Sequence, residues 1–105
     1  MIFLITQTHA PESMPSEEEG GIAMLFKNPE EIPDFKLKKT YYSSGEHTVY
    51  YIIETKEYER IDEFLKPGLD RTLSVINPVE KIDWIIKMLG IYREFLHSIT
   101  TYLEN

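Results

Sequence analysis

The sequence predicts an α+β fold: a ferredoxin-like βαββαβ plait with a four-stranded antiparallel sheet, followed by a long C-terminal helix. Two observations predict it. Short apolar stretches with strand character alternate with helical patterns in the order strand, helix, strand, strand, helix, strand. A heptad pattern then fills the last quarter of the chain. We therefore expect a ferredoxin-like domain over residues 1–78 and an amphipathic helix over residues 79–105.

The composition fits one globular domain. The chain has 105 residues, 42% of them hydrophobic and 28% charged, which allows a core without cross-links. A net charge of -7 argues against a non-specific grip on nucleic acid and against a basic membrane-surface helix. The absence of cysteine excludes disulfides, thiolate nucleophiles and cysteine-based zinc sites. No apolar run approaches the roughly 18 residues of a membrane span, so a cytoplasmic protein is expected.

The stretch over residues 47–55 predicts a strand that is buried on both faces. Its apolar side chains alternate between the faces, with Tyr50 and Ile52 on one and Val49, Tyr51 and Ile53 on the other. Two helices of a plait cover only one face of the sheet. The second face therefore needs another cover, and an exposed face would leave an apolar patch of several hundred Å². The candidates are the sheet of a second copy, or the C-terminal helix folded back over the face or packed on a partner's helix.

The first strand is expected over residues 2–8, with its apolar half inside the sheet and a polar end at Thr6, Gln7, Thr8 and His9. Such an end either delivers residues to a site or leaves the core. Ser16 and three glutamates then favour a helix start. Because Gly20 and Gly21 follow at once, the helix near residues 17–27 is expected to be short and irregular.

The second strand is expected over residues 35–43, with Phe35, Leu37 and Tyr41 on one face. Turn residues at 43–46 predict a hairpin into the next strand. Thr55 is the expected cap of the second helix, whose apolar stripe spans residues 58–65.

The fourth strand is expected over residues 71–76, and the C-terminal helix is expected to begin at Asn77 and Pro78 and to reach about residue 103. Gly90 weakens its middle. Its apolar positions alternate at intervals of three and four residues, which is a heptad seam: Ile82, Ile85, Leu89, Tyr92, Leu96, Ile99 and Leu103.

Three segments carry a resemblance to a known group. Residues 1–15, 46–55 and 77–79 resemble small prokaryotic proteins of unknown function that are similar to the dimeric α+β-barrel superfamily, which includes muconolactone isomerase and small monooxygenases. The resemblance covers roughly residues 1–79 and not the C-terminal helix. Members often have Cys where this chain has Met14, so no role is carried over to that position. The resemblance implies a ferredoxin-like fold and a homodimer, but no particular activity.

Two histidines and a carboxylate are the candidate chemical groups. His9 and Glu12 follow the first strand, and His47 opens the third. In a plait these strands are adjacent and antiparallel, so the three side chains can meet at one edge of the sheet. His9 and His47 are then candidate catalytic acid–base groups near neutral pH. With Glu12 they are also a candidate set of ligands for a divalent metal. The alternative is that each histidine is a solvated or hydrogen-bonded structural residue.

Tyrosines supply the candidate ligand-binding surface. Tyr42 and Tyr51, with Glu12, are the predicted ligand-binding residues, and the alternative is that the tyrosines are core and interface residues. Three functions remain open: a small homo-oligomeric protein with a small-ligand or metal pocket at the sheet edge, a monooxygenase- or isomerase-like enzyme using His9 and His47, and a structural or interaction module assembled through the C-terminal helix.

Overall fold

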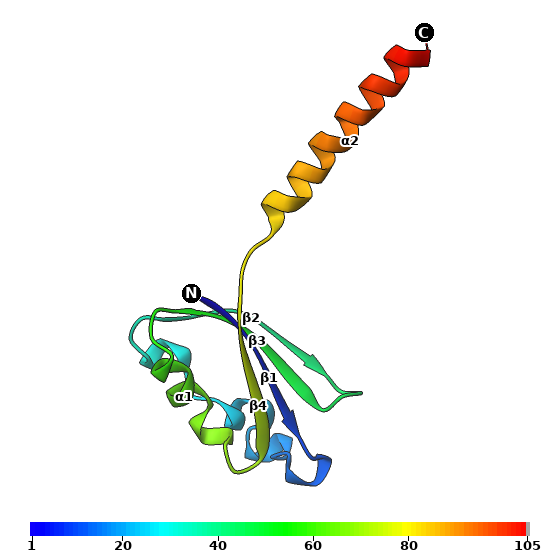
Figure 1. The fold of residues 1–105 in the computed structure, drawn as a ribbon. Coiled ribbons are helices and arrows are strands. Elements are labelled where there is room, and N and C mark those ends of the chain that lie inside the picture. The colour runs from blue at the N-terminus through cyan, green and yellow to red at the C-terminus, as the bar shows by residue number, and fades with distance from the viewer. Residues whose placement is uncertain (105) are drawn as a thin grey trace.

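Four strands form one antiparallel sheet in the computed structural model, which describes residues 1–104 (Figure 1). The strands are β1 (Ile2–His9), β2 (Phe35–Ser43), β3 (Thr48–Thr55) and β4 (Thr72–Val79). Their order across the sheet is β2-β3-β1-β4, and every neighbouring pair is antiparallel. The predicted α+β class and four-stranded antiparallel sheet are confirmed.

One short helix and a series of 3-10 turns cover one face of the sheet. The helix α1 (Glu59–Leu65) buries Ile61, Phe64 and Leu65. The helix expected near residues 17–27 is instead a pair of 3-10 turns, η2 (Glu17–Glu19) and η3 (Gly21–Leu25). Gly20 and Gly21 have φ of 115° and 58°, in the left-handed region, so a continuous α-helix cannot pass through them. Three further turns are η1 (Pro11–Ser13), η4 (Pro29–Glu31) and η5 (Lys66–Gly68).

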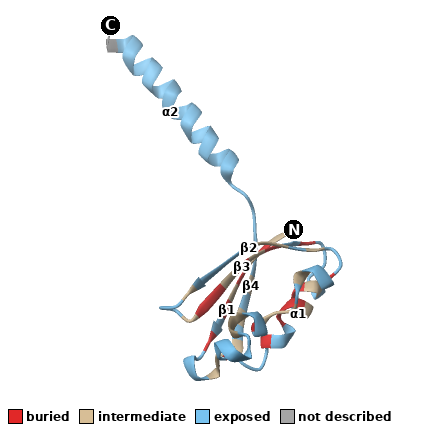
Figure 2. Ribbon diagram, turned by 180° about the vertical axis from the view of Figure 1, so that it is seen from behind, coloured by how far each residue is buried: buried red, intermediate tan, exposed pale blue. Residues whose placement is uncertain are grey.

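The core lies between the sheet and this covering layer (Figure 2). Tyr51 of β3 and Phe64 of α1 meet edge to face, with ring centroids 5.1 Å apart. Phe26 packs against both rings, at 5.7 Å and 5.3 Å. The buried apolar residues are Phe3, Ile5, Leu25, Ile32, Val49, Tyr51, Ile53, Ile61, Phe64 and Leu65.

The polar end of β1 does not leave the core. Burial alternates along the strand, and Phe3, Ile5, Gln7 and His9 all point to the covered face. Gln7 is completely buried, and the burial of its polar amide is tolerated because both ends of the amide are hydrogen-bonded. Its Nε2 donates to the carbonyl oxygen of Leu25 at 2.9 Å, and its Oε1 accepts from the Tyr51 hydroxyl at 2.6 Å.

The opposite face, called the open face below, has no described helix or turn packed over it. Its apolar residues are half-buried in β1 and β3 and exposed towards both edges of the sheet; they are Ile2, Leu4, Tyr41, Tyr50, Ile52, Leu73, Val75 and Val79. The prediction that β3 is buried on both faces is wrong, because Tyr50 and Ile52 are only half-buried on the open face, although the strand does carry apolar side chains on both sides. Within the described chain only one of those sides is covered.

A β-bulge changes which face the end of β2 presents. The register with β3 shifts between Leu37 and Lys39, so Lys38 is the extra residue. Tyr41 therefore lies opposite Tyr50 on the open face, and Tyr42 lies opposite Val49 on the covered face. The prediction that Tyr41 shares a face with Phe35 and Leu37 is wrong, because the bulge reverses the alternation between them.

Two predicted helix starts are also wrong. Asn77 and Pro78 belong to β4, where they pair with Leu4 and Phe3 of β1. Proline is tolerated there because β4 is an edge strand. Thr55 does not cap α1; its hydroxyl donates to the carbonyl oxygen of Asp34 at 2.7 Å, and α1 begins only after Tyr58.

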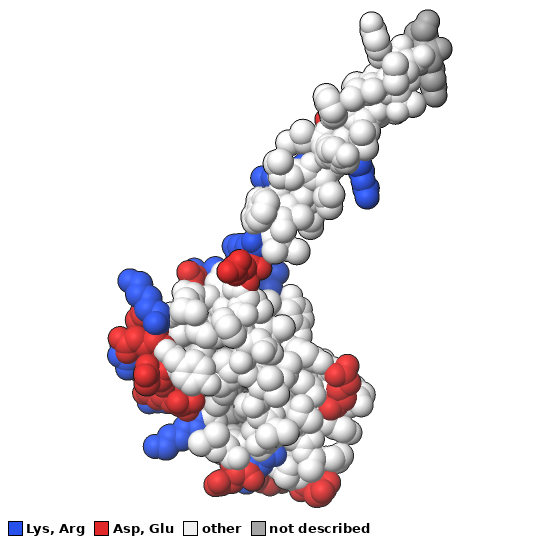
Figure 3. Space-filling model, viewed as in Figure 1, with Lys and Arg blue, Asp and Glu red and all other residues white. Residues whose placement is uncertain are grey.

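The C-terminal helix α2 (Asp83–Glu104) follows β4 after three linker residues and stands away from the sheet (Figure 1). It confirms the predicted long helix, although it begins six residues later than Asn77; Asn105 lies outside the described residues. Every residue from 77 to 103 is exposed. Figure 3 shows few charged side chains on α2. Among the described helices, none has the length and apolar character needed to cross a membrane.

Candidate functional site

The end of β1 and the start of β3 bring two histidines together. The backbone N–H of His9 donates to the carbonyl oxygen of His47 at 2.9 Å, which fixes the two residues side by side. Their imidazole rings meet edge to face, with centroids 5.5 Å apart. His9 is buried and His47 is half-buried. The antiparallel pairing of β1 and β3 thus produces the proximity that the sequence pattern suggested.

Tyr42 joins this pair from β2. Its hydroxyl lies 3.2 Å from Nε2 of His9, and the two rings are nearly parallel with centroids 6.0 Å apart. Nδ1 of His9 lies 3.2 Å from the carbonyl oxygen of Ala10. Because a carbonyl can only accept, the contact with Ala10 assigns a proton to Nδ1, and in the neutral ring Nε2 then accepts from the Tyr42 hydroxyl. The Tyr42 side chain remains exposed beside the buried imidazole.

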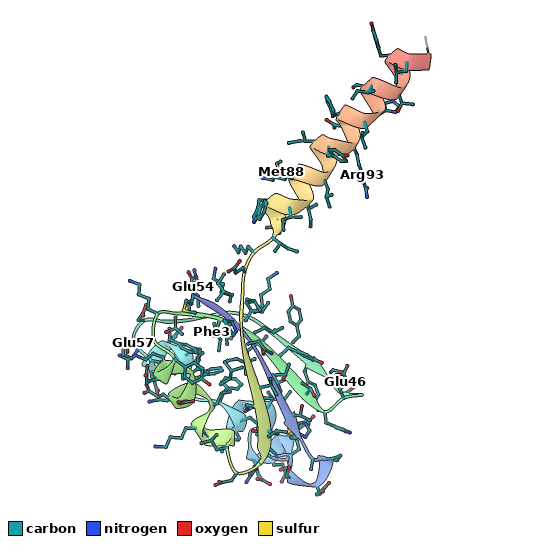
Figure 4. All side chains as sticks on the ribbon, viewed as in Figure 1. Phe3, Glu46, Glu54, Glu57, Met88 and Arg93 are labelled. Atoms are coloured by element: carbon teal, nitrogen blue, oxygen red, sulfur yellow. The ribbon has the colours of Figure 1, made fainter. Side chains whose placement is uncertain are left out.

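The hairpin between β2 and β3 positions His47. His47 has φ of 52°, in the left-handed region that residues with a side chain rarely occupy. The hairpin is held by Glu46, whose backbone N–H donates to Oγ of Ser43 at 3.3 Å. Its carboxylate accepts from the Tyr50 hydroxyl at 2.7 Å, and this hydrogen bond raises the pKa of Tyr50. Figure 4 shows Glu46 at the tip of the sheet.

Glu12 lies in the exposed turn η1, after β1. Among residues 1–104, no three His, Asp or Glu side chains are grouped so that they could hold a metal ion. His9 and His47 therefore meet without Glu12 completing a set of metal ligands around them.

Tyr51, the other predicted ligand-binding tyrosine, lies inside the core. Its side chain is completely buried, and its hydroxyl is engaged by Gln7. Burial raises the pKa of Tyr51 far above its ordinary value of 10.0. Tyr51 therefore packs and hydrogen-bonds inside the core and does not reach the protein surface.

A shallow hollow of about 530 Å³ lies beside His9 on the side of β4. The residues of β4 that line this hollow were not predicted from the sequence, although Thr72 of β4 pairs directly with His9 across the sheet. Ser13 closes one side by donating from Oγ to the carbonyl oxygen of Arg71 at 3.1 Å. The lining residues are Thr8, His9, Ala10, Ser13, Asp70, Arg71, Thr72 and Leu73.

Comparison of the chain with protein-family models, with curated proteins and with solved structures finds no match.

Proposed function

We propose that this protein is a self-assembling homo-oligomer and that α2 is its assembly element. The observation that carries the proposal is the exposure of the apolar side chains on and just before α2: Ile82, Trp84, Ile85, Ile86, Met88, Leu89, Ile91, Tyr92, Phe95, Leu96, Ile99, Tyr102 and Leu103. Their exposed area is on the order of 1,000 Å² per chain. Monomers rarely expose more than a few hundred Å² in one patch, whereas a stable interface needs about 800 Å² per partner.

The assembly is consistent with the superfamily that the sequence resembles. The strand order β2-β3-β1-β4 and the antiparallel pairing support a ferredoxin-like plait of the dimeric α+β-barrel kind. The 3-10 turns in place of the first helix depart from that pattern. The open face is a second apolar surface that assembly can cover.

The test is the molar mass of the full chain by light scattering. Leu89→Lys with Leu96→Lys places two charges in the heptad seam, and Lys87→Glu changes a charge on the polar side of the same helix as a control. We expect the unmodified chain and the control to have the mass of an oligomer and the double variant to have a smaller mass. A monomeric unmodified chain contradicts the proposal.

A second candidate function is favoured by the cluster of His9, Tyr42 and His47. The exposed Tyr42 hydroxyl lies 3.2 Å from Nε2 of His9, and the half-buried His47 ring lies next to that pair. This arrangement suits binding of a small polar ligand, or acid–base catalysis of the isomerase or monooxygenase type, in which Tyr42 and His47 exchange protons with the ligand and His9 accepts the tyrosine proton.

The test of this second candidate is a thermal-shift screen of small carboxylates, phenols and divalent metals. A compound that raises the melting temperature of the unmodified chain must lose that effect in Tyr42→Phe and His47→Asn. Tyr41→Phe, on the open face, is the matched control and keeps the shift. If no compound shifts the unmodified chain, or if all variants shift equally, the cluster is structural.

A further inference from the structure

The helix α2 carries a second apolar seam beside the heptad seam. The first seam runs through Ile85, Leu89, Tyr92, Leu96, Ile99 and Leu103. The second repeats at the same alternating intervals of three and four and is interrupted only at Ser98; its apolar members are Trp84, Met88, Ile91, Phe95 and Tyr102. At 100° per residue the two seams lie side by side and make the apolar surface about half of the helix circumference wide.

One neighbouring helix cannot cover so wide a surface. A two-stranded coiled coil buries only a narrow stripe, whereas a helix packed on a core buries a stripe of about 100° or more. The charged residues of α2 lie on the other side, where Arg93 projects away from Met88 (Figure 4). Each α2 therefore needs two neighbours, one for each seam.

The open face of the sheet has the properties of the second neighbour. Apolar side chains lie on it in all four strands, beside Lys39 and Glu54, and Leu73 and Val75 are 74% and 50% exposed. A hollow of about 520 Å³ lies on it, lined by the apolar side chains of Ile2, Tyr41, Ile52 and Val79 and by the charged residues Lys38, Lys39, Glu80 and Lys81. A bulky side chain of the second seam, such as Trp84 or Phe95, is of a size that such a hollow accommodates. The strand β4 spans about 26 Å and α2 about 33 Å, so a helix can cover the full length of the sheet.

We propose that α2 of one copy lies across the open face of a second copy, with its second seam on the sheet and its first seam against the second copy's α2. This inference rests on the proposed self-assembly and names the surface that each seam occupies. The linker supports exchange between copies. It has three residues, Glu80, Lys81 and Ile82, none of them glycine, and it directs α2 away from its own sheet (Figure 1). A short linker that does not let a helix turn back onto its own domain favours the exchange of that helix between chains.

Because the chain has no cysteine, single engineered thiols can test the arrangement. One chain carries Val75→Cys on the open face and a differently tagged chain carries Ile91→Cys in the second seam. The chains are mixed under conditions that allow exchange, treated with a short bismaleimide and separated by mass. Glu94→Cys, on the polar side of α2, replaces Ile91→Cys in the control mixture. A single chain carrying both Val75→Cys and Ile91→Cys reports links within one copy.

We expect a product that joins the two differently tagged chains, at several-fold higher yield than in the control mixture. A link within the doubly substituted chain, without links between chains, places α2 on its own sheet and overturns the exchange. Products that join only Val75→Cys chains place two sheets face to face and overturn it as well. In both cases, an oligomeric mass by light scattering still supports the proposed self-assembly. A monomeric mass contradicts both the self-assembly and the exchange of α2 between copies.

Discussion

The Tyr51 hydroxyl donates a 2.6 Å hydrogen bond to Oε1 of Gln7 in the centre of the core. The same amide donates from Nε2 to the carbonyl oxygen of Leu25 at 2.9 Å. This chain of hydrogen bonds ties β3 to β1 and then to the 3-10 segment that replaces the first helix. It holds an irregular covering layer on the sheet where regular helix packing is absent.

Replacing Gln7 with Leu is expected to destabilise the fold. The substitution leaves the Tyr51 hydroxyl and the Leu25 carbonyl buried without their partner, at a cost of about 1–3 kcal/mol. Chemical denaturation measures the loss. Tyr51→Phe together with Gln7→Leu should cost less than the sum of the two single variants, because both remove the same hydrogen bond. Strict additivity would show that the bond has no energetic role.

Stability is expected to fall at alkaline pH through Tyr51. Burial raises its pKa in the folded state above the ordinary value of 10.0, so the folded protein favours the protonated phenol. The resulting stabilisation is fully present below pH 10 and is lost as the pH rises above 10. Unfolding free energies measured between pH 9 and 11 should fall less steeply in Tyr51→Phe. An unchanged slope would contradict the assignment.

Gly68→Ala is expected to destabilise the protein by about 1–3 kcal/mol. A Cβ at this position would lie 2.5 Å from the Leu25 carbonyl oxygen and 2.7 Å from Nε2 of Gln7, so it would disturb the same hydrogen bonds. Gly45→Ala is the matched control, because a Cβ there meets nothing within 4 Å. Melting temperatures of the two variants compare them directly, and equal values would show that the close approach at Gly68 is easily relieved.

His47→Asn is expected to keep the fold while removing the imidazole. Asparagine tolerates the left-handed φ of 52° that this position requires. His47→Val, a β-branched residue in the same conformation, should lose roughly 1–2 kcal/mol. Thermal melts of the two variants separate the backbone requirement from the chemistry of the ring. A destabilised His47→Asn would mean that the ring itself supports the hairpin.

The sheet could be predicted from the sequence because its signals are local. Continuous apolar runs place β1 and β3, and the range of β2 agrees with its prediction. Pro78 was the misleading signal: it suits the first turn of a helix, but an edge strand tolerates it equally well. Only the pairing of residues 77–79 with β1 decides whether these residues form a strand or the start of a helix.

The candidate site depends on features that the sequence does not encode locally. The approach of His9 to His47 follows from strand pairing and was predictable. The contact of Tyr42 with His9 was not, because it depends on the bulge at Lys38, and no residue type marks that position. The burial of Gln7 was missed for a related reason, since its partners lie 18 and 44 positions away.

Pro78 and the bulge at Lys38 also affect how copies of this chain can join. The outer strands β4 and β2 are the two free edges of the sheet. Pro78 has no backbone N–H to offer an incoming strand. The bulge and the lysines at 36, 38 and 39 disturb and charge the other edge. Both edges thus resist strand-by-strand growth into fibrils, which opposes one route to amyloid-like aggregation in a protein with this much exposed apolar surface.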